Sequence, residues 1–127
     1  MPDLFSSVLI VDDHQSMRRT IADIMRMLGY TNLHFAEDGL NALDKLADTP
    51  SIDLILLDWN MPKMTGIEFL QKIRTEHKYK KLPVLMITAE AEQSQVIQAV
   101  QAGATNYIVK PFTPATLQRK LKETIRG

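Results

Sequence analysis

Several apolar runs of this sequence end in side chains that bind cations or phosphate groups. The residues at these ends are Asp12, Asp13, Asp58, Thr88 and Lys110. Carboxylate oxygens are ligands for hard cations, a lysine ammonium supplies a point positive charge for a phosphoryl oxygen, and a hydroxyl donates a hydrogen bond to another. These residue types together indicate a site for phosphoryl transfer.

Three carboxylates in one site need a compensating cation. Two like charges about 4 Å apart repel by roughly 4 kcal/mol at an effective dielectric constant of 20. Oxygen-only ligands favour Mg²⁺. The predicted ligands are Asp12, Asp13, Asp58 and the backbone carbonyl of Asn60. Asp58 is then the predicted nucleophile, and it would form an aspartyl phosphate in a reaction governed by positioning and charge stabilisation.

Each of these residues also has an ordinary interpretation. Asp12 and Asp13 are suitable caps for a following helix, and Asp58 is suitable for a turn. Thr88 is common in strands, and Lys110 is typical of a solvated surface. The ordinary interpretation requires five independent coincidences at the ends of strands, so the shared site is favoured.

Apolar patterning predicts five strands that alternate with five helices. The strands are expected at 8–11, 33–36, 54–57, 83–88 and 107–109. The helices are expected at about 17–28, 40–47, 67–73, 92–102 and 114–125. Gly29 and Gly103 are predicted helix stops, Thr113 is a predicted N-cap, and the charged stretch 76–81 is predicted to be a solvated loop.

This alternation predicts an α/β fold with a doubly wound, five-stranded parallel sheet and helices on both faces. The carboxyl ends of parallel strands share one edge of the sheet, where α/β proteins bind their ligands. We therefore expect the polar residues that end the strands to converge there.

Length and composition limit the function classes. The 127 residues predict one domain, with no room for an attached effector domain. Lysine plus arginine and aspartate plus glutamate balance at 15 each, which gives no support for binding nucleic acid or an anionic membrane. Cysteine is absent, so disulfides and thiolate metal sites are excluded. We find no signal peptide and no apolar segment of about 20 residues, and we expect a cytoplasmic location.

In its motifs, the chain resembles the receiver domain of two-component response regulators. The matching residues run in order along the whole chain: Asp12-Asp13, Asp58 with Met61-Pro62 and Gly66, Thr88-Ala89, and Lys110-Pro111. Residues 11–13, 17–19, 58–62, 82–90 and 110–113 are similar to the chemotaxis members of that family. The resemblance implies a flavodoxin-like (βα)5 fold with sheet order 2-1-3-4-5 and a cis bond before Pro111.

The resemblance also implies a phosphorylation cycle. A histidine kinase of the chemotaxis type, or a small phosphodonor such as acetyl phosphate, would phosphorylate Asp58 in the presence of Mg²⁺. Asn60 and Glu90 would tune self-catalysed hydrolysis, and a phosphatase is a further expected partner. Thr88 and Tyr107 would form the switch pair that rearranges when the phosphoryl group arrives, by a shift between two existing states.

Two positions depart from the chemotaxis pattern. His14 stands where those relatives usually have phenylalanine, and a surface imidazole is favoured over a metal ligand. Glu92 and Gln93 stand where flagellar-switch binders usually carry two lysines, which counts against a flagellar partner. The output surface keeps part of its basic, partly apolar character in Val96, Val100, Tyr107 and Lys120.

The favoured function is a monomeric, stand-alone phospho-switch in chemotaxis and flagellar motor control, acting through its fourth helix, fifth strand and last helix. The alternative is the same chemistry with a non-flagellar target, or a role as phosphate sink or relay. An aspartyl phosphatase is disfavoured, because Asn60 stands where such hydrolases carry a second aspartate. A nucleotide binder is disfavoured because no glycine-rich phosphate loop follows any predicted strand.

Overall fold

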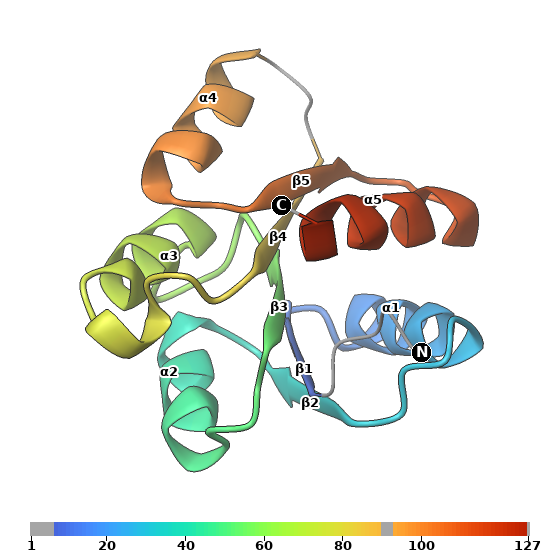
Figure 1. The fold of residues 1–127 in the computed structure, drawn as a ribbon, viewed down its shortest axis with the longest axis horizontal. Helices are drawn as coiled ribbons and strands as arrows, with labels where there is room; N and C mark the ends of the chain where they lie inside the picture. Colours follow the sequence, from blue (N-terminus) through green and yellow to red (C-terminus); the bar gives the residue numbers. More distant parts are fainter. Residues whose placement is uncertain (1–6, 90–92, 127) are drawn as a thin grey trace.

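A computed structural model of the chain describes residues 7–89 and 93–126. Figure 1 shows one central sheet with α1 and α5 on one face and α2, α3 and α4 on the other. The elements are β1 Val8–Val11, α1 Gln15–Met27, β2 Leu33–Ala36, α2 Gly39–Asp48, β3 Leu54–Asp58, α3 Gly66–Arg74, the 3-10 helix η1 His77–Tyr79, β4 Val84–Thr88, α4 Gln93–Ala102, β5 Asn106–Val109 and α5 Pro114–Arg126. The predicted fold class is confirmed.

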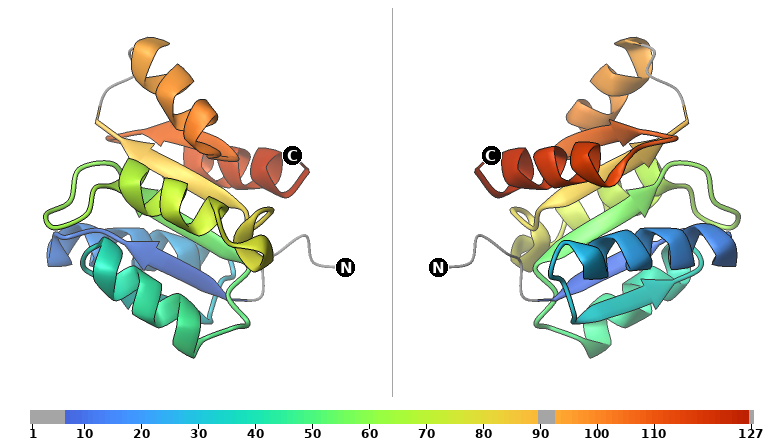
Figure 2. Two further views of the ribbon diagram at one scale, coloured as in Figure 1. Left: turned by 90° about the vertical axis from the view of Figure 1, so that its left-hand side faces the viewer. Right: turned by 90° about the vertical axis from the view of Figure 1, so that its right-hand side faces the viewer.

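The five strands are all parallel and lie in the order β2-β1-β3-β4-β5, as the resemblance implied. The views in Figure 2 show the strand arrows pointing toward one side of the molecule. Every residue of β1, β3 and β4 is buried, which explains why these strands are continuous apolar runs rather than alternating ones. The edge strands β2 and β5 are only partly buried, so their sequence patterns are weaker.

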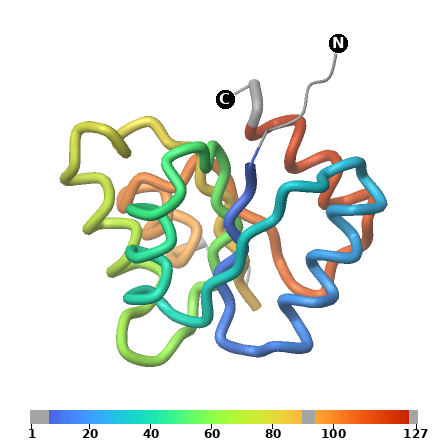
Figure 3. Tube along the Cα trace, turned by 90° about the horizontal axis from the view of Figure 1, so that it is seen from below, coloured from blue at the N-terminus to red at the C-terminus, as the bar shows by residue number. Residues whose placement is uncertain are grey.

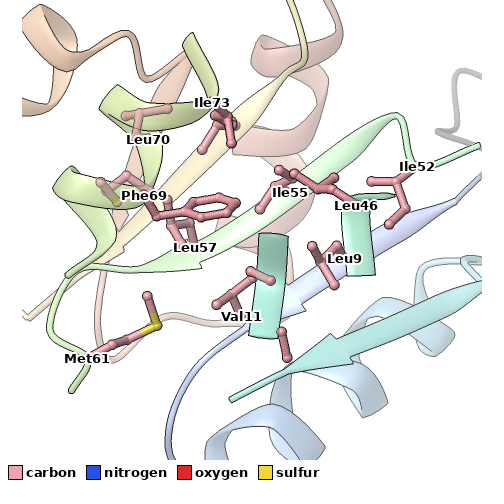
Figure 4. Packing of buried hydrophobic residues seen from close by; sticks show 14 of the residues in the cluster. Leu9, Val11, Leu46, Ile52, Ile55, Leu57, Met61, Phe69, Leu70 and Ile73 are labelled. Atoms are coloured by element: carbon pink, nitrogen blue, oxygen red, sulfur yellow. The ribbon is translucent and has the colours of Figure 1, made fainter. Parts of the chain in front are cut away.

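Successive residues of the central strands point to opposite faces and form two cores. On β1, Leu9 and Val11 pack with the layer of α2, α3 and α4, whereas Val8 and Ile10 pack with the layer of α1 and α5. Figure 3 shows the strands between these two layers, and Figure 4 shows Phe69 of α3 beside β3 in the first core. Burying an apolar side chain of this size contributes about 1.5–3 kcal/mol to the stability of the fold, so the two cores together stabilise the sheet that carries the polar strand ends.

Helix termini follow the predicted signals. Gly29 and Gly103 have φ angles of 103° and 105°, a left-handed conformation that glycine adopts without a Cβ clash. Thr113 precedes α5, and its Oγ1 accepts a hydrogen bond from the Thr116 amide at 3.1 Å. Thr65 and Glu68 form a capping box at the start of α3, which anchors the end of the loop after β3.

Some boundaries differ from the predictions. β3 extends to Asp58, β4 begins one residue after Pro83, and β5 begins at Asn106. Part of the predicted loop 76–81 is the 3-10 helix η1. Leu40, expected on the apolar stripe of the second helix, is 49% exposed because it lies on the solvent side of α2. The expected start of the fourth helix at residue 92 lies outside the described residues.

Among the helices of the described residues, none is both long and apolar enough to cross a membrane.

Candidate functional site

Strand register brings the polar strand ends together at one edge of the sheet. Val11 pairs with Leu57, so the residues that follow them, Asp12 and Asp58, are neighbours across β1 and β3. Asp58 pairs with Ile87, and Thr88 pairs with Val109. The described residues therefore place the ends of β1, β3, β4 and β5 in one row.

Lys110 joins two buried carboxylates. Its Nζ lies 3.1 Å from Asp58 Oδ1 and 4.0 Å from Asp12 Oδ2. Asp12 is fully buried, and Asp58 is 4% exposed. The lysine is held in place by its backbone, because its amide donates to the Thr88 carbonyl at 2.8 Å. The Lys110–Pro111 peptide bond is cis, as the resemblance implied.

The electrostatics of Asp58 follow from this burial. Desolvation raises the pKa of the Asp58 carboxyl above its usual value, and the negative charge of Asp12 raises it further. Lys110 lowers this pKa through its charge and its hydrogen bond, and Asp13 makes the smallest raising contribution. One lysine thus compensates only part of the negative charge that gathers here.

A second group of possible ligands begins the loop into α1. One ligand atom each from Asp12, Asp13 and His14 lies within 4.8 Å of the others. Asp12 Oδ1 accepts a hydrogen bond from the His14 amide at 2.9 Å. Asp12 Oδ2 is buried and accepts no hydrogen bond. A buried carboxylate oxygen without a hydrogen bond is costly, and a divalent cation would satisfy it, so the carboxylates of Asp12 and Asp13 fit Mg²⁺.

The loop after β3 carries Trp59, which is half-buried, and Asn60, which is exposed. The Gly66 amide donates to the Trp59 carbonyl at 2.9 Å and closes this loop. A Cβ on Gly66 would collide with the backbone carbonyl oxygen of Asp58. Glycine therefore allows α3 to begin directly against the end of β3, a steric role that the sequence pattern alone does not reveal.

Thr88 connects the site to α4. Its side chain is buried, and its Oγ1 lies 3.4 Å from Gln95 Oε1. Tyr107 on β5 is half-buried, and Lys120 Nζ of α5 lies 4.3 Å from the centroid of its ring. The predicted site residue Glu90 and the surface residue Glu92 lie outside the described residues, as does the side chain of Gln93.

Comparison with known proteins gives a consistent family. A family model described as "Response regulator receiver domain" matches residues 8–122. The chain is 53% identical over 114 residues to "Chemotaxis protein CheY-3" of Vibrio cholerae, covering 90% of this chain and 87% of that protein. It is 48% identical over 116 residues to "Chemotaxis protein CheY" of Pseudomonas aeruginosa, covering 91% and 93%.

Solved structures agree in fold. The structure of Vibrio cholerae chemotaxis protein CheY4 superposes with a TM-score of 0.87 at 37% identity, covering 95% of this chain and 99% of that one. A putative response regulator from Chloroflexus aurantiacus gives a TM-score of 0.89 at 30% identity, covering 96% and 98%.

Proposed function

The chain belongs to the response regulator receiver family, and on that premise we propose that it is a stand-alone CheY-type regulator that accepts a phosphoryl group on Asp58. A receiver domain is a signalling domain and not a classical enzyme. The names of the relatives from Vibrio cholerae and Pseudomonas aeruginosa support a role in chemotaxis. The high coverage of those relatives supports a protein that works without an effector domain.

The observation that carries this proposal is the Lys110 ammonium shared by Asp58 and Asp12. In phosphoryl transfer, an Asp58 oxygen attacks the phosphorus of a phosphohistidine, and the phosphorus–nitrogen bond breaks as the phosphorus–oxygen bond forms. Lys110 is close enough to bind a phosphoryl oxygen as soon as it is bonded to Asp58. The Thr88 hydroxyl, at the end of the next strand, would donate to another.

We propose that Asp12, Asp13, Asp58 and the Asn60 carbonyl hold Mg²⁺. When bound, Mg²⁺ would neutralise charge on the carboxylates and on the phosphoryl oxygens. The unsatisfied Asp12 Oδ2 supports this assignment.

Output would pass from Thr88 to the face made by α4, β5 and α5. The contact between Thr88 and Gln95 gives the site a direct route to α4. Tyr107 is the proposed second member of the switch pair, and Asn60 and Glu90 would tune hydrolysis. Expected partners of the monomer are a CheA-like histidine kinase and a phosphatase. A flagellar switch protein is the candidate target of the output face, and Glu92 and Gln93 count against it.

A second candidate has the same chemistry but a non-flagellar target, or a role as phosphate sink or relay. It is favoured by Glu92 and Gln93, since neither residue supplies the positive charge expected at a flagellar-switch contact.

Labelling with acetyl phosphate tests the proposal. In the presence of Mg²⁺, the wild type should gain one base-labile phosphoryl group per chain, and Asp58→Asn should gain none. Asp44→Asn, on the exposed side of α2, is the matched control and should label normally. Unchanged labelling of Asp58→Asn would contradict the assignment, and continued release of many phosphates per chain would indicate an enzyme.

The metal site needs its own measurement. Mg²⁺ titration should change the fluorescence of Trp59, the only tryptophan, because it follows Asp58 directly. Asp13→Ala should weaken the apparent Mg²⁺ affinity. Absence of Mg²⁺ binding to the wild type by calorimetry would refute the site.

A further inference from the structure

The imidazole of His14 lies against the acidic pair although its side chain is 69% exposed. Nδ1 is 3.3 Å from Asp12 Oδ1 and 3.1 Å from Asp13 Oδ1. His14 occupies the N-cap position of α1, yet its side chain makes no capping hydrogen bond to the helix. The ring therefore does not cap the start of the helix, and its polar contacts are with two carboxylates.

These separations match those between adjacent ligands of a small divalent ion. With metal–ligand distances of about 2.0–2.2 Å, neighbouring ligand atoms lie about 3 Å apart in an octahedron and slightly farther apart in a tetrahedron. The Nδ1 atom is thus spaced from each of the two carboxylate oxygens as one ligand is from its neighbour, and one ligand atom from each of the three residues lies within 4.8 Å of the others.

A second, independent feature, at the other oxygen of the Asp12 carboxylate, points to a cation beside this residue. Asp12 is fully buried, and its Oδ2 accepts no hydrogen bond. The Lys110 ammonium lies 4.0 Å from that oxygen and is also engaged by Asp58 at 3.1 Å. The buried carboxylate therefore retains coordination capacity that its protein neighbours do not use.

We propose that His14 is an additional ligand of this cation site and shifts its selectivity toward first-row transition ions such as Ni²⁺. The inference rests on the proposed Mg²⁺ site, which it extends from oxygen ligands to a mixed oxygen and nitrogen set. Imidazole suits Ni²⁺, Cu²⁺ and Zn²⁺, whereas Mg²⁺ prefers oxygen ligands and keeps its waters. His14 should therefore strengthen Ni²⁺ binding and leave Mg²⁺ binding almost unchanged.

Calorimetric titration of the tag-free full chain with Ni²⁺ or with Mg²⁺ tests this inference. The two ions are similar in size and both form octahedral complexes, so the comparison isolates ligand preference. The variants are His14→Phe and His14→Gln, the second of which keeps a polar side chain at the start of α1. The control is His77→Phe, which removes an exposed imidazole from η1. Quenching of Trp59 fluorescence by Ni²⁺ gives a second readout.

Loss of even an outer partner of a metal ligand costs about 10- to 100-fold in affinity, so both His14 variants should weaken Ni²⁺ binding by at least about tenfold. Mg²⁺ affinity should change by less than about threefold, and His77→Phe should behave like the wild type. Unchanged Ni²⁺ affinity in the His14 variants, or an equal loss for both ions, would overturn the role of His14. If the wild type binds neither ion, the proposed Mg²⁺ site itself is wrong. If the wild type binds Mg²⁺ and is labelled on Asp58, a negative Ni²⁺ result contradicts only the role of His14.

Discussion

At the scale of single residues, the site is defined by a charge imbalance. Asp58 and Asp12 are both buried, and one ammonium group serves both. A buried carboxylate without full compensation raises the free energy of the native state. This charge imbalance should therefore make the metal-free protein less stable.

Asp58→Asn should stabilise the metal-free protein at neutral pH. Because the pKa of Asp58 is raised above 3.8 in the native state, its contribution to stability is present below that value and is lost as pH rises through the native pKa. Asparagine does not ionise, so the variant does not lose stability as the pH rises. Its urea midpoint should therefore exceed that of the wild type at pH 7 in EDTA. The difference should disappear as pH falls toward 3.8.

Mg²⁺ should reverse this order. A ligand at 100 times its dissociation constant stabilises the native state by about 2.7 kcal/mol, and Asp58→Asn removes one of the proposed ligands. Urea unfolding with and without Mg²⁺ measures both effects, and Asp44→Asn on α2 should show neither. A wild type more stable than Asp58→Asn at pH 7 in EDTA would show that Lys110 compensates Asp58 fully.

The convergence of the strand-end residues at one site was predictable from the sequence, because the carboxyl ends of parallel strands share one edge of the sheet. Their contacts were not predictable in detail. His14 was expected at the surface, and its exposure agrees, but its approach to Asp12 and Asp13 depends on a side-chain rotamer that no spacing encodes. The tight packing at Gly66 depends likewise on the path of the loop.

At the scale of elements, the loop between β3 and α3 returns to pack Gly66 against the backbone of Asp58. Gly66→Ala would place a Cβ against the Asp58 carbonyl oxygen, which cannot yield without moving the strand end. We expect a loss of about 1–3 kcal/mol in the free energy of unfolding and a slower reaction with acetyl phosphate. Urea unfolding and labelling rates measure the two effects.

Gly103→Ala separates local distortion from general destabilisation. Gly103 has a φ of 105°, so alanine there should cost about 1–2 kcal/mol. Its Cβ would meet the side chain of Arg74, at the other end of the sheet from Asp58. Gly103→Ala should therefore label at the wild-type rate. If both variants react equally slowly with acetyl phosphate, the slower labelling of Gly66→Ala is explained by its lower stability alone.

Sequence reasoning recovered the strands and helices because buried runs and helical periodicity are local signals. It missed the role of Arg74, whose guanidinium donates to the Gly103 carbonyl at 3.0 and 2.8 Å and to the Tyr79 carbonyl at 2.6 Å. These bonds tie α3 to η1 and to the end of α4. Burial lowers the pKa of Arg74, and no local pattern marks a contact across 29 positions.

At the scale of the whole molecule, the candidate site and the proposed output face of α4, β5 and α5 lie on adjoining elements. Thr88 ends β4 within the site, and its contact with Gln95 reaches α4, which exposes Ile97 and Val100. Thr88→Val keeps the shape of the side chain and removes the hydroxyl. The variant should still be phosphorylated on Asp58, but its affinity for a target peptide should no longer depend on phosphorylation.

Fluorescence anisotropy with a labelled peptide, with and without acetyl phosphate, measures this dependence. Thr105→Val is a comparable change at the opposite end of β4, where Thr105 Oγ1 accepts from the Val84 amide at 3.0 Å. That variant should retain the phosphorylation response. A normal phosphorylation response in Thr88→Val would show that the Thr88 hydroxyl is not required for the switch.

The final prediction concerns charge on the output face. Glu92→Lys with Gln93→Lys adds two positive charges and removes one negative charge where an acidic flagellar-switch peptide is expected to make contact, on a chain whose net charge is zero. Charges at the edge of an interface mainly set association rate and suppress wrong partners. We expect the phosphorylated double variant to bind such a peptide about tenfold more tightly than the wild type, or by about 1.4 kcal/mol, and to lose most of the gain in high salt.

The control variant, Asp44→Lys with Gln71→Lys, makes the same change in charge on α2 and α3 and should gain little affinity for the peptide. A phosphorylated wild type that binds the peptide as tightly as the double variant would refute the charge argument and favour the flagellar partner.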